Sequence, residues 1–349
     1  GDEQFDTHTI TVTDTGVTVN NPTDLVADED DIVGADGNPG GTNDVDPPSP
    51  LVGTVTYDIG DSPVDNIQLS TGATGLVTLD DTPLNVVTIW QASDTGPGGV
   101  LVGYKEGGDA DSTSDRIFTI TVANGDVTDT AADYTMVLLQ PVRHHTDELA
   151  DDEENNTTPF DVTVRVEDDD GSFNTNVFSV AINDDTPELS IPDTDTATVA
   201  EGAAAISGSI AASEGADQEG TLDVTVTDAG GSLSSDISFE LDGTDQQATA
   251  TVNNGIQDLG ALTISYAGAT DGAVTWSFTP SDQVDNELAA GFTFDATLTD
   301  ADGDEQFDTH TITVTDTGVT VNNPTDLVAD EDDIVGADGN PGGTNDVDP

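Results

Sequence analysis

The first 47 residues of this chain return unchanged at its other end. Residues 1–47 are identical to residues 303–349, so each of these positions recurs 302 residues later. Identity over such a length indicates a tandem array, because near-identical copies are typical of proteins built from stacked repeats. The chain is therefore expected to contain one full repeat and an overlap, and to fold as modules that follow one another along a line.

A fainter repeat lies inside this period. Residues 160–187 align without gaps with residues 292–319. Both stretches pass from an alternating segment through an Asp-x-Asp-Gly turn, which begins at Asp168 or Asp300, to a second alternating segment with an acidic end. This predicts two related modules in each repeat. The expected divisions are residues 1–18 as the last strand of a preceding module, 19–186 as one module with a long acidic opening loop, 187–318 as a second module, and 319–349, identical to 17–47, as the start of the next.

Short segments that alternate apolar and polar residues recur along the chain. Phe292, Phe294 and Leu298, for example, are separated by polar residues at the period of a half-buried strand. The same alternation occurs at Val55–Tyr57, Phe118–Val122, Tyr134–Leu138, Val162–Val166, Phe178–Ile182, Leu222–Val226 and Val274–Phe278. We therefore predict an all-β fold of tandem antiparallel β-sandwich modules, bacterial Ig-like in type and arranged in a linear array. Trp90 and Trp276 are expected in the cores.

The charge of the chain restricts its partners. There are 71 Asp and Glu residues against 4 Lys and Arg, giving a formal net charge of -67. Nucleic acid is excluded, since binding to phosphates requires basic residues, and direct insertion into a membrane is not expected because no apolar stretch is long enough. There is no cysteine, which excludes disulfides and thiolate metal sites. Self-repulsion of this size destabilises a compact state, so bound divalent cations or concentrated salt are expected to relieve it.

The acidic residues gather at turns and at the openings and ends of the predicted modules. A pair of carboxylates on a turn, followed by Gly, offers oxygen atoms of the kind that Ca²⁺ binds in sets of six to eight. We expect carboxylates from a module end, a module opening and a neighbouring turn to converge on calcium ions at the joints. The candidate ligands are Asp28, Glu29, Asp30, Asp168, Asp170, Asp184, Asp185, Asp193, Asp195, Glu201, Asp300, Asp302, Asp304, Asp316 and Glu331, the last being the second copy of Glu29.

Other interpretations remain open at this stage. Halophilic adaptation explains few basic residues, but it does not explain why the acids concentrate at turns. His144 and His145 form an adjacent pair near acids, which suggests a transition-metal or acid–base site only weakly because no third ligand is apparent. No catalytic motif is defensible, so the chain is not expected to be an enzyme. A calcium-dependent module that binds a glycan or a cell, and a fibre subunit joined to other copies by strand addition, are the alternative functions.

Three stretches of the chain resemble a known family. They are ADEDDIVGADGNPGGTNDVDP, YTMVLLQPVRHHTDELADDEENN and FDVTVRVEDDDGSFNTNVFSVAINDDTP, in this order. Together they resemble the extender repeats of giant type I-secreted RTX adhesins, over about residues 19–186. The resemblance implies calcium-stiffened arrays that hold a distal adhesive region away from a Gram-negative cell, on the cell surface or in a biofilm matrix, with neighbouring modules as partners. It favours as calcium ligands Glu29, Asp168, Asp170, Asp184, Glu201, Asp300, Asp302 and Asp316.

Overall fold

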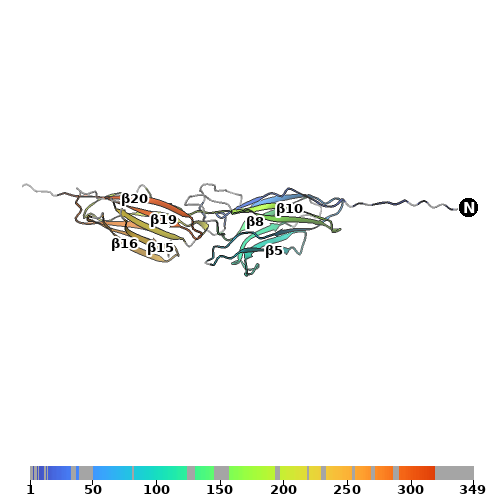
Figure 1. Ribbon diagram of the computed structural model, residues 1–349, viewed down its shortest axis with the longest axis horizontal. Coiled ribbons are helices and arrows are strands. Elements are labelled where there is room, and N and C mark those ends of the chain that lie inside the picture. The colour runs from blue at the N-terminus through green and yellow to red at the C-terminus, as the bar shows by residue number, and fades with distance from the viewer. Residues whose placement is uncertain are drawn as a thin grey trace, which may run out of the picture.

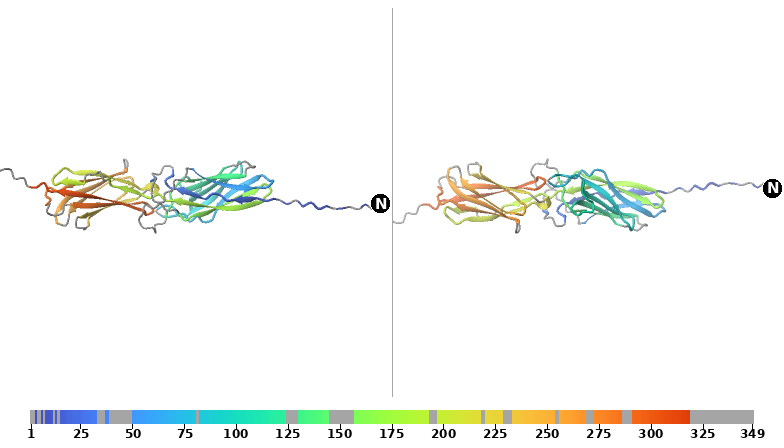
Figure 2. Two further views of the ribbon diagram at one scale, coloured as in Figure 1. Left: turned by 90° about the horizontal axis from the view of Figure 1, so that it is seen from above. Right: turned by 90° about the horizontal axis from the view of Figure 1, so that it is seen from below.

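The computed structural model describes residues 3, 6, 8–11, 13, 15–32, 37–38, 50–80, 82–123, 130–144, 157–192, 197–217, 220–228, 233–253, 256–268, 272–285 and 291–318. These residues form four β-sheets, which pack in pairs as two β-sandwich modules placed end to end along the long axis of the molecule (Figure 1). The views in Figure 2 show the same linear arrangement from two further sides. The prediction of an all-β fold of tandem sandwiches is confirmed.

The first module is built from ten strands of the first half of the chain. They are β1 (Thr18–Asn20), β2 (Leu25–Asp28), β3 (Leu51–Asp58), β4 (Val64–Thr71), β5 (Val86–Ala92), β6 (Gly99–Lys105), β7 (Arg116–Val122), β8 (Ala131–Leu138), β9 (Phe160–Asp168) and β10 (Phe173–Asn183). One sheet has the order β1-β3-β8-β7-β6-β5 and the other β2-β10-β9-β4.

The second module follows the same plan. Its elements are β11 (Glu188–Ser190), β12 (Thr198–Ala200), β13 (Ile206–Ser213), the 3₁₀ helix η1 (Gly215–Asp217), β14 (Thr221–Asp228), β15 (Leu233–Glu240), β16 (Asp245–Asn253), β17 (Asp258–Ala267), β18 (Ala273–Pro280), β19 (Gly291–Thr299) and β20 (Glu305–Thr315). Its sheet orders are β11-β13-β18-β17-β16 and β12-β20-β19-β14-β15. They match those of the first module except at one strand: β5 pairs with β6, whereas the equivalent β15 pairs with β14 in the other sheet. The short repeat detected in the sequence is thus part of a similarity between whole modules.

Nearly all strand pairs are antiparallel, but each module has one parallel pair that positions a glutamate. β2 runs parallel to β10, and β12 runs parallel to β20. The residue after the short strand is Glu29 in the first module and Glu201 in the second, and each donates its backbone N–H to the last residue of the partner strand, Asn183 O or Thr315 O. A glutamate therefore lies at the same end of each sandwich, beside the point where the last strand finishes.

The alternating residues of the strands form two apolar cores. The residues predicted to face inward from the eight alternating segments are buried, as is Trp276, which is 1% exposed and packs beside Phe294. Trp90 is partly buried and packs against the first core. Ala216 of η1, in the second module, packs into the core cluster of the first. An apolar contact therefore joins the two modules.

One stretch of sequence has two different structures. Residues 303–315 include β20, which pairs with both β19 and β12. The identical residues 1–13 form no strand where the structure describes them. The difference has a simple cause: β20 has neighbouring strands to satisfy its backbone, whereas the described part of the first copy pairs with none.

Within the described residues, η1 is the only helix, and no helix is long and apolar enough to cross a membrane.

Candidate metal centre at the joint between the modules

The joint brings together acidic side chains from both modules. The end of the first module contributes Glu29, which follows β2, and Asp184, which follows β10. The second module contributes Asp217 from η1 and the β19–β20 turn with Asp300, Asp302 and Asp304. The backbone N–H of His144, in the segment after β8, donates to Asp302 Oδ2 at 2.9 Å across the joint.

These side chains form three groups whose ligand atoms lie within 4.8 Å of one another. The groups are Glu29, His144 and Asp184; Asp184, Asp302 and Asp304; and Asp217, Asp300 and Asp302. Asp184 belongs to two of the groups and Asp302 to two, so the three form one continuous cluster. Acidic groups this close repel one another in a buried site, and a multivalent cation relieves that repulsion.

Several buried oxygen atoms of the cluster have no hydrogen-bond partner in the described part of the chain. They are Glu29 Oε2, Asp300 Oδ2, Asp302 Oδ1 and both carboxylate oxygens of Asp217. A buried polar atom without a partner costs free energy. Their number in one place indicates a site shaped for an ion, and the oxygen-rich donor set fits a hard divalent cation.

The pKa values of the cluster reflect the same burial and mutual repulsion of acidic groups. Burial, together with the charge of Asp184, raises the pKa of Glu29 to about 8 against the opposing effect of His144. Burial and the neighbouring Asp302 raise the pKa of Asp300 to about 9, and burial and Asp184 raise that of Asp304 to about 8. Burial alone would lower the pKa of His144, but the charges of Glu29, Asp184 and Asp302 raise it to about 10. Without a cation, the folded joint therefore favours bound protons.

The β19–β20 turn is stabilised by hydrogen bonds to the side chain of its first residue, Asp300. Asp300 Oδ1 accepts hydrogen bonds from the N–H groups of Gly303 and Asp304, at 3.0 and 2.9 Å. Gly303 has a φ of 114°, a conformation that glycine adopts without strain. This leaves Asp300 Oδ2 directed into the cluster without a partner. The β9–β10 turn repeats the arrangement, because Asp168 Oδ1 accepts from Ser172 N at 2.8 Å and Gly171 has a φ of 94°.

Asn38, a loop residue that was not among the predicted site residues, connects the two modules by hydrogen bonds. Asn38 is 4% exposed and donates its backbone N–H to Asp185 at 3.1 Å. Its side-chain amide donates to Thr186 O at 3.0 Å and to Ser213 O, at the end of β13, at 3.3 Å. Asp185 also accepts from Ala216 N of η1. The Asn within the acidic opening loop therefore bridges the first module, the linker and the second module.

The predicted ligands that the structure describes lie in the cluster, beside it, or at the far end of either module. Glu29, Asp184, Asp300, Asp302 and Asp304 lie in the cluster. Asp28, Asp30 and Asp185 lie beside it, where Asp28 accepts from Asp30 N and Asp185 holds the joint by hydrogen bonds. Asp168 and Asp170 lie at the far end of the first module, because β10 separates them from Asn183 by its full length. Glu201 and Asp316 lie at the far end of the second module, and Asp193, Asp195 and Glu331 fall outside the described residues.

The sequence interpretation paired the end of one module with the opening of the next. The structure places Glu29, the opening of the first module, beside Asp184, the end of that same module. Of the opening of the second module, Glu201 lies at the far end and Asp193 and Asp195 are outside the described residues. The parallel pairing of β2 with β10 is the reason, since it carries the opening strand to the end of its own sandwich. Asp217 and His144 are the cluster members that the list of candidate ligands lacked. Asp217 belongs to no Asp-x-Asp pattern, and the orientation of a loop histidine cannot be read from its neighbours in sequence.

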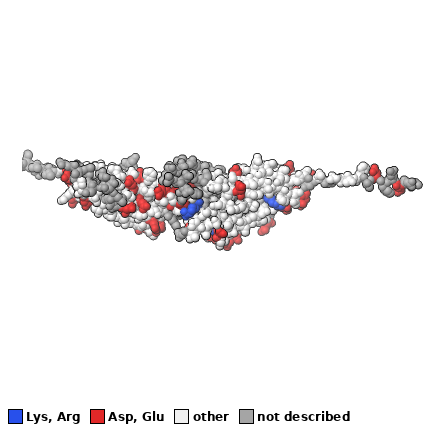
Figure 3. All heavy atoms as spheres, in the orientation of Figure 1, with Lys and Arg blue, Asp and Glu red and all other residues white. Residues whose placement is uncertain are grey.

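The charge distribution and the surface hollows add little to this picture. On the face shown in Figure 3, acidic atoms are spread along both modules and basic atoms occur in few places. Three of the four basic side chains form ion pairs within the first module: Lys105 with Asp80, Arg116 with Asp111 and Arg165 with Glu167.

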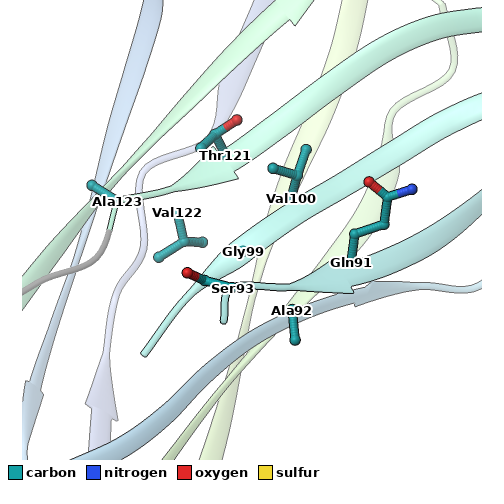
Figure 4. Close-up of a pocket in the computed structure, with 8 residues that line it drawn as sticks. All are labelled: Gln91, Ala92, Ser93, Gly99, Val100, Thr121, Val122 and Ala123. Carbon is teal, nitrogen blue, oxygen red and sulfur yellow. The ribbon is translucent and has the colours of Figure 1, made fainter. Parts of the chain in front are cut away.

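A hollow of about 360 Å³ lies at the ends of β5, β6 and β7 (Figure 4). Its lining, which includes Gln91, Ser93 and Thr121, contains no titratable side chain, so it is not a cation site.

No protein-family model and no curated protein matches the chain. Among solved structures it is similar to the titin domains Z1Z2 in complex with telethonin, with 10% identity, a TM-score of 0.38, and coverage of 88% of this chain and 100% of that one. It is also similar to the D00-D0 domain of intimin, with 11% identity, a TM-score of 0.22 and coverage of 85% and 98%. The C-terminal domain of Streptococcus agalactiae BspA gives 9% identity, a TM-score of 0.24 and coverage of 84% and 100%. Identities and TM-scores this low carry no information about function.

Proposed function

We propose that the chain is a calcium-stiffened structural repeat of a long extracellular filament, whose joints are fixed by calcium bound between modules. The observation that carries this proposal is the cluster of buried carboxylates at the joint, which takes ligands from both modules and contains oxygens without partners. Calcium is the ion best suited to it, because Ca²⁺ accepts many carboxylate oxygens in flexible geometry. An ion bound by Asp184 of one module and Asp302 and Asp304 of the other would fix their relative orientation.

The mechanism is electrostatic. In the absence of calcium, the carboxylates of the two modules repel one another and the joint is weakened. Calcium binds only the folded arrangement, and an ion that binds the folded state alone stabilises it, by about 2.7 kcal/mol at a concentration of one hundred times its dissociation constant. In the low-calcium cytosol the chain would remain unfolded and competent for export, and it would fold and stiffen outside the cell.

The wider role is an extender of a giant surface adhesin or matrix filament. It rests on three features of the chain: the exact repetition of 47 residues, the linear succession of sandwich modules, and the resemblance of three stretches to the extender repeats of type I-secreted RTX adhesins. In this role the repeat performs no catalysis. It holds a distal adhesive region away from a Gram-negative cell, with neighbouring modules and calcium ions as its partners.

Thermal unfolding tests the calcium proposal directly. The melting temperature is measured in EGTA, in millimolar calcium, and in molar KCl with EGTA. We expect calcium to raise the melting temperature and KCl to have little effect, since KCl screens charges but does not coordinate the cluster. Equal stabilisation by KCl would instead favour halophilic adaptation and contradict the proposal.

A matched pair of variants separates the site from charge in general. Asp302→Asn removes one charge from the cluster, and Asp161→Asn removes one from an exposed position of β9. Asp302→Asn is expected to lose much of the gain in melting temperature on adding calcium, while Asp161→Asn keeps it.

A further inference from the structure

His144 places a nitrogen atom among the carboxylates of the joint. The residue is 7% exposed, and its ring lies next to Glu29 and Asp184, with which it forms one of the three ligand groups. Calcium does not favour imidazole nitrogen, whereas zinc and other first-row transition metals do. The presence of a buried histidine in an otherwise carboxylate cluster therefore needs its own explanation.

The ring is oriented as in a histidine that binds a metal. Nε2 lies 3.3 Å from the carbonyl oxygen of Ile182. A carbonyl oxygen only accepts hydrogen bonds, so Nε2 carries the proton and, in the neutral ring, Nδ1 carries the lone pair. Metal-binding histidines commonly donate their other N–H to a carbonyl or carboxylate in this way, which fixes the ring.

Nδ1 is directed at the carboxylates. It lies 3.0 Å from Asp184 Oδ1, with which it forms an ion pair while the ring is protonated, and a metal bound there would take the place of the Nδ1 proton. Two ligand atoms that each lie about 2.0–2.2 Å from one ion are separated by about 3.0–3.5 Å, depending on the geometry. The observed 3.0 Å is at the short end of this range, so the two atoms are already close to the separation of two ligands of one ion.

Glu29 is fixed by a hydrogen bond through one of its oxygens, and its other oxygen is directed toward Asp184. Its side chain is fully buried, and one oxygen, Oε1, accepts the N–H of Val142 at 2.8 Å. The other oxygen, Oε2, has no partner among the described residues. Two side chains, both more than nine-tenths buried, thus direct ligand atoms into one space beside Asp184, and one of these atoms, Glu29 Oε2, has no hydrogen-bond partner among the described residues.

We propose that His144 Nδ1, Glu29 and Asp184 form a site for a first-row transition-metal dication such as Zn²⁺, next to the all-oxygen part of the cluster. The fourth position is left for water or for the second oxygen of a carboxylate. Asp184 also belongs to the group with Asp302 and Asp304, so its carboxylate can contribute to both parts of the cluster. The joint would then respond to two kinds of cation, and the transition-metal site would exist whether or not the oxygen-rich part binds calcium.

Zinc titration of the whole chain tests this site. Zn²⁺ is titrated by competition with a chromophoric chelator, once with saturating calcium and once in calcium-free buffer. We expect His144→Gln to weaken zinc binding at least about tenfold in both conditions. His8→Gln, which removes an exposed histidine, is the matched control and should bind zinc like the unaltered chain. Equal zinc affinity in His144→Gln and the unaltered chain would overturn the proposal, as would the absence of zinc binding by the unaltered chain.

A second measurement does not depend on a variant that folds. Nitrogen NMR of the histidine side chains in the unaltered protein reports which ring nitrogen binds zinc. We expect the Nδ1 signal of His144 to shift on zinc addition while Nε2 keeps its proton. A ring that stays doubly protonated in the presence of zinc would show that His144 is only a buried positive charge and would refute the site. The rise in melting temperature on adding calcium alone is read separately, so failure of the zinc site and failure of the calcium proposal are distinguishable.

Discussion

At the scale of single residues, the charge state of a carboxylate here depends on its neighbours more than on its position in the fold. Glu29 and Glu201 occupy equivalent positions and each accepts a backbone N–H, from Val142 or Val284. Glu201 also accepts the N–H and hydroxyl of Thr317, and these hydrogen bonds lower its pKa to about 2. Glu29 is fully buried at the joint, and its second oxygen has no hydrogen-bond partner among the described residues, so its pKa rises to about 8. Hydrogen bonds from the protein therefore stabilise the charged form of Glu201, whereas burial destabilises the charged form of Glu29.

Asp217 offers a test in which the sign of the effect depends on calcium. Its pKa is raised well above the ordinary value by burial and by the charges of Glu29, Asp302 and Asp184. In EGTA the buried carboxyl favours its protonated, neutral form, which the neutral amide of Asp217→Asn resembles in shape, so we expect the variant to be as stable as the unaltered chain or more stable there. In calcium the lost ligand should reduce the stabilisation by about 1–3 kcal/mol. Denaturant unfolding in the two buffers measures both effects, and a loss of equal size in both would show that Asp217 has only a structural role.

The raised pKa values also predict how stability depends on pH without metal. Glu29, Asp300, Asp304 and His144 all have folded-state pKa values above their ordinary ones. Each group therefore binds protons more tightly in the folded state. Its stabilising contribution is present below the unfolded pKa, near 4 for the carboxyls and 6.5 for His144, and is lost as the pH rises through about 8 to 10.

We expect the free energy of unfolding in EGTA to fall by at least about 2 kcal/mol between pH 5 and pH 9. Saturating calcium should flatten or reverse this slope, because calcium binds the ionised carboxylates. Denaturant unfolding at a series of pH values checks the prediction. A metal-free protein that becomes more stable with rising pH would contradict it.

At the scale of elements, the alternation of apolar and polar residues predicted the strands, but pairing with neighbouring strands determined which segments form them. The alternating segments were predictable because apolar residues at every second position have one way to become buried in a sandwich. The identical residues 1–13 and 303–315 carry the same pattern, yet the second copy forms β20 and the described residues of the first copy belong to no strand. The convergence of Asp184 with the Asp300–Asp304 turn was also predictable, since both lie at the ends of strands. The parallel pairing that brings Glu29 to Asp184 was not, because it depends on long-range contacts.

The predicted role of residues 1–18, as the last strand of a preceding module, is testable in trans. A second module that ends at residue 302 lacks β20, and with it the partner of both β12 and β19. A peptide of residues 1–18 contains the sequence of the missing strand. We expect the truncated module to be unfolded alone and to gain β-structure by circular dichroism when the peptide is added.

The peptide needs a control of the same length. A version in which Ile10 is replaced by Asp, at the position equivalent to the buried Ile312, should fail to restore the fold. If both peptides have the same effect, or neither has any, residues 1–18 do not act as this strand.

At the scale of the whole molecule, two sandwiches in a line are joined by a small set of contacts, and the cluster of mutually repelling carboxylates lies beside these contacts. Asn38, Asp185 and Ala216 hold the modules together by hydrogen bonds and apolar packing. Repulsion within the carboxylate cluster beside them opposes that contact, and a bound cation would relieve the repulsion. A module pair with these features should be two sandwiches that bend freely relative to each other without calcium and one stiff rod with it.

Small-angle X-ray scattering of the full chain measures this stiffening. On adding calcium we expect the maximum dimension to increase and the scattering to lose the signature of flexibility, because fixing the joint removes bent arrangements. Asp302→Asn with Asp304→Asn should remain flexible in calcium, whereas Asp168→Asn with Asp170→Asn, at the far end of the first module, should stiffen like the unaltered chain. That contrast is informative because both pairs remove two carboxylates from equivalent turns, one at the joint and the other at the far end of the first module. Equal behaviour of the two variants would mean that calcium stiffens the chain by general charge neutralisation and not by an ion held between the modules.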